Sequence, residues 1–125
     1  MKPRDTALRI RRFEAAEKSR KVSSIETMIV DFEHMALDLA RQIAAEEERT
    51  GIKDPAHFAY STFAKAAGLR RANLQTSIGD LRVKLEIARR EHEDAMEELR
   101  KLEPIESREV DRVLSKNDRS SAVIG

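Results

Sequence analysis

The first half of the chain carries a strict seven-residue repeat of apolar side chains. Between residues 22 and 43, apolar residues recur at alternating spacings of three and four: Val22, Ile25, Ile29, Phe32, Ala36, Leu39 and Ile43. Because a helix has 3.6 residues per turn, this spacing places the apolar side chains in one stripe, the kind of stripe along which helices pair in a coiled coil. The stripe predicts one helix over about residues 5–49, and Gly51 suits the left-handed position that ends a helix.

A second stripe of the same kind follows in the other half of the chain. It consists of Leu74, Ile78, Leu81, Leu85, Ala88, His92, Ala95, Leu99 and Leu102. We expect a turn at residues 50–54 and a second helix over about residues 55–103, because Asp54 suits an N-cap and Pro55 the first helical position. Ser61 is a second candidate for the cap, so the sequence leaves the start of this helix open. Pro104 is expected to end or kink the helix, leaving residues 104–125 as a tail that is weakly helical and then disordered.

Charged residues change sign along the chain in four blocks. The net charge is +5 for residues 1–21, −6 for residues 22–48, +6 for residues 49–90 and −4 for residues 91–103. If the second helix folds back on the first, each block lies beside a block of opposite sign, whereas a parallel dimer in register sets each block against itself. We therefore predict an all-α fold: two long helices forming an antiparallel coiled-coil hairpin over residues 1–103. Two chains associating antiparallel would match the signs as well, so both a monomer and antiparallel self-association are compatible with the pattern.

The predicted seam of the hairpin consists of twelve apolar residues. They are Val22, Ile25, Ile29, Phe32, Leu39, Ile43, Leu74, Ile78, Leu81, Leu85, Leu99 and Leu102. The segment between the two stripes holds three of the five aromatic residues of the chain. In the hairpin we expect Tyr60, then Phe63 or Ala64, and then Ala67 to continue the seam, with Phe63 closing its open end. Phe58 has no partner in this arrangement and is predicted to be exposed, so it is a candidate partner-binding residue together with the exposed side of Tyr60.

Several classes of activity find no support in the sequence. The chain has no cysteine, which excludes disulfides and cysteine-ligated zinc and fits a reducing compartment. Neither a phosphate-binding glycine loop nor a GxSxG nucleophile motif is present, and the three histidines form no HxxxH pair. We therefore predict a protein that is not an enzyme, with no catalytic, cofactor-binding or metal-binding residues and no cofactor. No apolar run approaches the roughly 20 residues of a membrane span, and the basic N-terminal stretch lacks the apolar region of a secretory signal, so no direct membrane insertion is expected.

Two charged clusters raise other functions. Arg9, Arg11 and Arg12 form a basic stretch that could contact nucleic acid, but the acidic block at residues 91–103 is expected to lie beside it, so we predict no nucleic-acid partner. Residues 46–48 and Asp54 place four carboxylates near the turn, which suggests a transcription-associated coiled-coil finger that binds RNA polymerase. Proteins of that Gre/DksA-like type also carry a globular part, often with zinc-binding cysteines, which this sequence lacks. A generic coiled-coil adaptor or scaffold remains a further alternative.

Three segments resemble a known family. They are RDTALRIRRFEAAEKSRKVSSIETMI, then GIKDPAHFAYSTFAKAAGLRRANL, and finally LRVKLEIARREHEDAMEELRKLE. All three are similar to alphaproteobacterial members of the FliJ family, the small coiled-coil subunit of the flagellar type III export apparatus. The resemblance covers about residues 4–112 and is most specific in the middle segment. The fold of that family is a two-helix antiparallel coiled coil.

The resemblance implies a function in flagellum biogenesis and motility. It implies a non-enzymatic component of protein export that docks to the export ATPase ring, to the membrane protein of the export gate and to export chaperones. Such a protein is cytoplasmic and lies peripherally at the export apparatus of the inner membrane. By analogy with the family, Arg9, Arg11 and Arg12 would lie inside the ATPase ring, which makes them candidate partner-binding residues alongside Phe58 and Tyr60.

Overall fold

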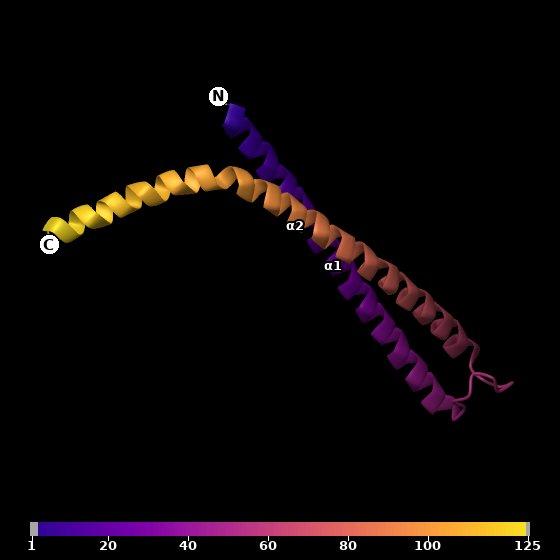
Figure 1. The fold of residues 1–125 in the computed structure, drawn as a ribbon. Coiled ribbons are helices and arrows are strands. Elements are labelled where there is room, and N and C mark those ends of the chain that lie inside the picture. The colour runs from indigo at the N-terminus through magenta and orange to yellow at the C-terminus, as the bar shows by residue number, and fades with distance from the viewer. Residues whose placement is uncertain (1–2, 125) are drawn as a thin grey trace. The chain divides into compact units, whose positions relative to one another are not determined.

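The computed structural model describes residues 3–124, with side chains described for residues 3–103 and for Leu114. It contains two helices, α1 (Pro3–Thr50) and α2 (Thr62–Ile124), and the described residues include no strand. Residues 51–61, called the interhelix loop below, join the two helices (Figure 1). The helices pack against each other, so the predicted all-α hairpin is confirmed.

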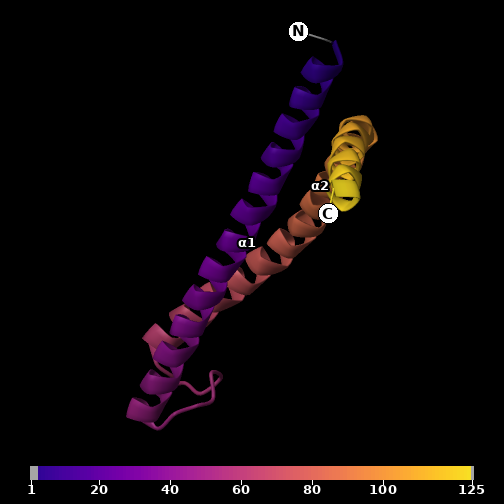
Figure 2. The same cartoon turned by 90° about the vertical axis from the view of Figure 1, so that its left-hand side faces the viewer.

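The chain divides into two compact units. The loop unit is Lys21–Ala88, and the terminal unit is Met1–Arg20 together with Arg89–Gly125. Within the loop unit, a segment of α1 and a segment of α2 run side by side in opposite directions, as the views in Figures 1 and 2 agree. Its core is formed by six buried residues, with Val22 and Phe32 packed against them: Ile25, Ile29, Ile78, Leu81, Leu85 and Ala88.

The terminal unit has its own core and its own ion pairs. Leu8 and Ala15 of α1 pack against Leu99 of α2, and Ala95, Met96 and Leu102 border this cluster. Ion pairs join the helices here, among them Lys18 with Glu91 at 3.0 Å and Arg12 with Glu103 at 3.7 Å.

The loop unit has an ion pair of the same kind, between Arg82 and Glu33 at 3.0 Å. Each of these three pairs joins blocks of opposite sign, as the charge pattern predicts. Since an exposed pair contributes only about 0–1 kcal/mol, the pairs favour the antiparallel direction more than they stabilise the fold.

All twelve predicted seam residues are at least half-buried. Seven are buried, namely Ile25, Ile29, Leu39, Ile78, Leu81, Leu85 and Leu99. Val22, Phe32, Ile43, Leu74 and Leu102 are half-buried. Nine of the twelve belong to the two core clusters or pack against them.

Of the two starts that the sequence leaves open for the second helix, the structure has the one that follows Ser61. The helix begins at Thr62 rather than at Pro55. Phe63 is 55% exposed and does not close the seam. Ala64, the alternative to Phe63, is buried, and so is Ala67, as expected for the continuation of the seam. Ile43 of α1 lies beside Gly68, where a Cβ atom would lie 4.0 Å from Ile43 Cδ1.

The end of α2 also differs from the prediction. The helix runs through Pro104 to Ile124, so this proline does not end it, and the expected disordered tail is helical as far as Ile124. A proline inside a helix removes one hydrogen bond, but the residues around it contain no glycine and include good helix formers, which allows the helix to continue. The weak helical pattern expected in the tail rests on Val110, Val113 and Leu114; Leu114 is 55% exposed, and the other two side chains lie outside those described.

Candidate functional site

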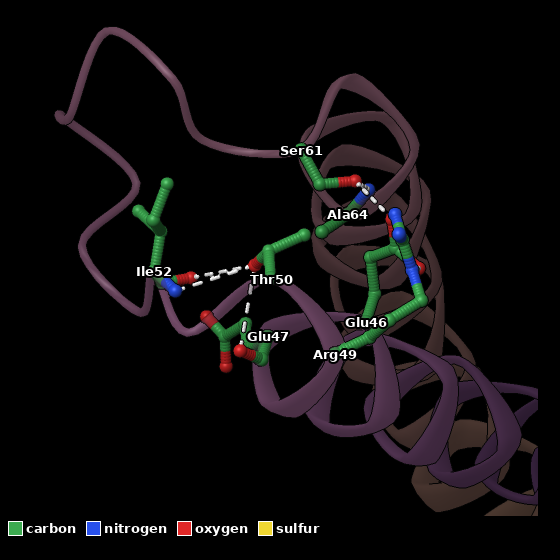
Figure 3. A network of polar contacts seen from close by, with 7 residues as sticks. All are labelled: Glu46, Glu47, Arg49, Thr50, Ile52, Ser61 and Ala64. Carbon is green, nitrogen blue, oxygen red and sulfur yellow. Dashed lines mark hydrogen bonds and ion pairs between the residues drawn. The ribbon is translucent and has the colours of Figure 1, made fainter.

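The interhelix loop begins with a defined end to α1. Gly51 has φ of 73°, in the left-handed region that a residue without a Cβ adopts readily. Its N–H donates to the carbonyl oxygen of Glu47 at 2.9 Å, which is the hydrogen bond of a left-handed helix cap. The hydroxyl of Thr50 accepts the N–H of Ile52 at 3.3 Å (Figure 3). These contacts turn the chain away from the axis of α1, as the sequence predicted for Gly51.

Two consecutive turns form the middle of the loop. The N–H of His57 donates to the carbonyl oxygen of Asp54 at 3.0 Å, and the Asp54 carboxylate accepts the N–H of Ala56 at 2.9 Å. In the second turn the N–H of Tyr60 donates to the carbonyl oxygen of His57 at 3.0 Å.

Asp54 and Pro55 therefore build a turn and not the start of a helix. Aspartate at the first position and proline at the second position favour a turn as well as a helix cap. The second turn then interrupts the helical hydrogen-bond pattern before it can continue.

Ser61 is the residue that caps α2. Its Oγ accepts the N–H of Ala64 at 3.2 Å and donates to Glu46 Oε1 at 2.9 Å (Figure 3). Glu46 is held from its own helix as well, because Arg49 donates to both of its carboxylate oxygens, at 2.5 and 3.1 Å. The hydrogen bonds from Arg49 and Ser61 lower the pKa of Glu46 below its ordinary value of 4.5. This carboxylate thus connects the last turn of α1 to the first turn of α2.

The side chain of Tyr60 is a second link between the loop and the end of α1. The half-buried phenol donates a hydrogen bond to Glu47 Oε2 at 2.9 Å. Partial burial, and next the hydrogen bond to the Glu47 carboxylate, raise the pKa of Tyr60 above its ordinary value of 10.0. Tyr60 was predicted to bind a partner, and the structure gives its hydroxyl a role in the loop itself.

Phe58 projects from the loop into solvent. Its side chain is 97% exposed, in agreement with the exposure predicted from the seam. The ring stacks on the imidazole of His57, with ring centroids 4.8 Å apart and planes inclined by 23°. The imidazole is itself held, because His57 Nδ1 accepts the N–H of Ala59 at 3.0 Å. Hydrogen bonds of the backbone before and after Phe58 therefore order the loop that carries this ring. Burial of the exposed ring by a partner protein would be favourable.

The three predicted arginines lie in the other unit. Arg9 is exposed, Arg11 pairs with Glu14 of the same helix at 3.1 Å, and Arg12 pairs with Glu103. The five predicted partner-binding residues thus form two sets, with Phe58 and Tyr60 in the loop unit and the arginines in the terminal unit.

Three of the four acidic residues near the turn have structural partners. Glu46 and Glu47 bind Ser61 and Tyr60, and Asp54 caps the first turn of the loop. In the sequence these carboxylates suggested a displayed acidic group, and the hydrogen bonds of Glu46 and Glu47 to the loop were not predicted. The hydrogen bonds join residues 13 and 15 positions apart across the loop, so no short-range spacing in the sequence signals them.

Within the described residues, no group of three or more acidic or histidine side chains is arranged to hold a metal ion. The same part of the chain contains no helix with the length and apolar character of a membrane span. No family model, curated protein or solved structure matches the chain.

Proposed function

We propose that this chain is a non-enzymatic subunit of a flagellar protein-export apparatus of the FliJ type. It works in the cytoplasm, peripherally at the inner membrane, by docking to the export ATPase ring, to the export gate and to export chaperones. The observation that carries the proposal is the segment from Gly51 to Gly68. This segment has the most specific resemblance to that family, and it forms the interhelix loop and the start of α2.

The local structure of this segment supports a docking role. Gly51, Asp54 and Ser61 are accounted for by the helix cap and the turns that they form. Phe58 is not accounted for in this way, since its ring contacts only the neighbouring imidazole and is almost fully exposed. An aromatic ring on an ordered loop is a common anchor in protein interfaces, because burying it is favourable and little loop entropy is lost.

The helices of the loop unit offer further apolar contact area. The side chains of Leu69, Val83 and Ile87 on α2 are each more than half exposed, at 67%, 63% and 53%. Their spacings are multiples of a helical turn, so they share one face of α2. A protein that recruits several partners needs such additional surface beyond a single anchor.

Deletion of the gene in its native host is the direct test. We expect loss of swimming and of filament-protein secretion, with recovery when the gene is supplied in trans. Normal motility and secretion in the deletion strain would reject the export function and would favour the generic coiled-coil adaptor.

A point substitution then tests the loop. Phe58→Ala should leave the helical circular dichroism unchanged while reducing secretion several-fold in the complemented strain. Lys53→Ala, at another exposed loop position, is the matched control and should secrete normally. If both variants secrete like the wild type, the loop serves only to connect the helices.

A further inference from the structure

Two exposed apolar side chains lie together on the side of α1 that faces away from α2 in the terminal unit. Leu8 and Ala15 are buried against α2, so they mark the inner side of this helix. Ile10 lies two residues after Leu8, and Phe13 two residues before Ala15, which is a rotation of about 200° around the helix axis. Ile10 and Phe13 are 51% and 64% exposed. Being three residues apart, they share one face of the helix, and this pair is called the outer patch below.

The outer patch lies in the most basic part of α1. The segment from Thr6 to Phe13 contains three arginines and no acidic residue. Arg9, directly before Ile10, is exposed and forms no ion pair with another described side chain. Residues 3–20 carry six basic and three acidic side chains, a net charge of +3. An anionic partner is therefore the one that this surface attracts.

Most of the carboxylates near the outer patch are already engaged. Glu14 pairs with Arg11 of the same helix, and Glu17 pairs with Arg20. Asp5 is the one other carboxylate of residues 3–20, and it lies more than one helical turn before Ile10. Arg9 therefore keeps its charge available beside the two exposed apolar side chains.

The acidic side chains of α2 in this unit lie on its opposite side. Glu97 is two residues before the buried Leu99, so it points away from α1. Glu93 and Asp94 lie four and three residues before Glu97 and share its exposed face. Two helix diameters, about 20 Å, separate this face from the outer patch, which exceeds the Debye length of about 8 Å at physiological salt. The terminal unit thus has one basic and one acidic outer face.

The short length of the outer patch selects the kind of anionic partner. Pairing with another helix requires apolar side chains over several heptads. Here the same face has Thr6 four residues before Ile10 and Glu17 four residues after Phe13, so its apolar part is one helical turn long. The headgroup region of a bilayer needs no complementary groove, and it accepts single aromatic and aliphatic side chains beside arginines.

We propose that the outer patch binds the surface of an anionic lipid bilayer. The first turns of α1 lie along the bilayer surface, with Ile10 and Phe13 inserted between lipid headgroups and Arg9 bound to their phosphates. The attachment is peripheral and reversible, because only two side chains enter the interface. It does not depend on the export function. A chain that binds vesicles while its deletion leaves secretion normal would keep this inference and reject the export function.

Vesicle sedimentation with the full chain is the first test. One set of vesicles is phosphatidylcholine alone, and in the other about a third of the lipid is anionic phosphatidylglycerol. We expect the chain to sediment with the anionic vesicles and to bind the neutral ones at least about tenfold more weakly. Added salt should release the chain from the anionic vesicles, since the attraction of Arg9 is screened.

A fluorescent side chain locates the contact. The chain has no tryptophan, so Phe13→Trp places a unique fluorophore in the outer patch. Its emission should shift to the blue when anionic vesicles are added, and lipids brominated on the acyl chain should quench it. Phe58→Trp is the matched control, because Phe58 is 97% exposed but belongs to the interhelix loop. The emission of that variant should not change.

Substitutions separate lipid binding from folding. Replacing both Ile10 and Phe13 with alanine should weaken vesicle binding at least about tenfold with an unchanged melting temperature, because both side chains are exposed and alanine favours a helix. Arg9→Glu should weaken binding to the anionic vesicles by about tenfold. Lys65→Glu makes the same charge change at an exposed position of the loop unit and should alter binding less than about twofold.

The proposal is overturned if the chain does not sediment with anionic vesicles, or if it binds neutral vesicles equally well. It is also overturned if the double alanine variant binds like the wild type. A blue shift of Phe58→Trp without one of Phe13→Trp would assign the lipid contact to the interhelix loop. A shift of Phe13→Trp on adding an acidic helical peptide or a short DNA duplex, with none on adding vesicles, would assign the outer patch to that partner instead.

Discussion

At the scale of single residues, Ser61 determines where the second helix starts. Its hydroxyl accepts a hydrogen bond from the first turn of α2 and donates one to Glu46 at the end of α1. Asp54 has an equally good side chain for capping but uses it in a turn. Both residues fit the sequence rule for an N-cap, and the choice between them depends on a carboxylate that lies on the other helix. Local sequence could not make that choice.

Tyr60 gives a residue-scale prediction, because it is the only tyrosine in a chain without tryptophan. Its phenol should ionise above the ordinary pKa of 10.0 when the ultraviolet absorbance of the phenolate is followed with pH, since burial and then the Glu47 hydrogen bond disfavour the phenolate. Glu47→Gln should bring the pKa closer to 10.0 without reaching it, because the burial remains. The urea-unfolded chain is the control and should titrate at the ordinary value.

The raised pKa of Tyr60 predicts how the free energy of unfolding depends on pH. The folded-state pKa is raised, so the contribution of Tyr60 is fully present below pH 10.0 and is lost as the pH rises through the folded-state value. The difference in unfolding free energy between the wild type and Tyr60→Phe should therefore shrink at alkaline pH. A difference that stays constant across that range would contradict the assigned hydrogen bond.

At the scale of elements, replacing glycine with alanine should change stability in opposite directions at Gly51 and at Gly79. Gly51 has a positive φ, so Gly51→Ala should destabilise the protein by about 1–2 kcal/mol although no atom lies within 4 Å of the new Cβ. Gly79 lies inside α2 without a positive φ and also has open space, so Gly79→Ala should stabilise by about 0.5–1 kcal/mol. Urea unfolding followed by circular dichroism measures both free energies. Equal effects of the two substitutions would refute the helix end at Gly51.

The helices were predictable from the sequence, whereas most of the contacts around the loop were not. Apolar periodicity identifies the seam because each helix must bury one stripe whatever its partner is. The exposure of Phe58 was predictable because it falls off that stripe. The bracing of Tyr60 by Glu47 was not, since it joins residues across the loop.

At the scale of the whole molecule, the charge blocks fit pairing of the two helices within one chain as well as antiparallel pairing between two chains, and a crosslink separates the two arrangements. The Glu33–Arg82 contact lies within one chain, so a chain carrying both Glu33→Cys and Arg82→Cys should be crosslinked internally by a short bismaleimide. The product should run as a monomer on a denaturing gel at every protein concentration. Since the natural chain has no cysteine, each single variant serves as the background control. Crosslinked dimers as the main product would instead show pairing between two chains.

The interhelix loop contributes none of the buried side chains among the described residues, all of which belong to α1 or α2. The covalent connection through the loop therefore acts mainly by keeping the two helices at a high effective concentration, in the millimolar range for a short link. Protease cleavage after the exposed Phe58 would turn folding into a binding reaction between two separate peptides. Those peptides could be synthesised independently, so that isotopes or fluorophores are placed in only one helix of the reassembled pair.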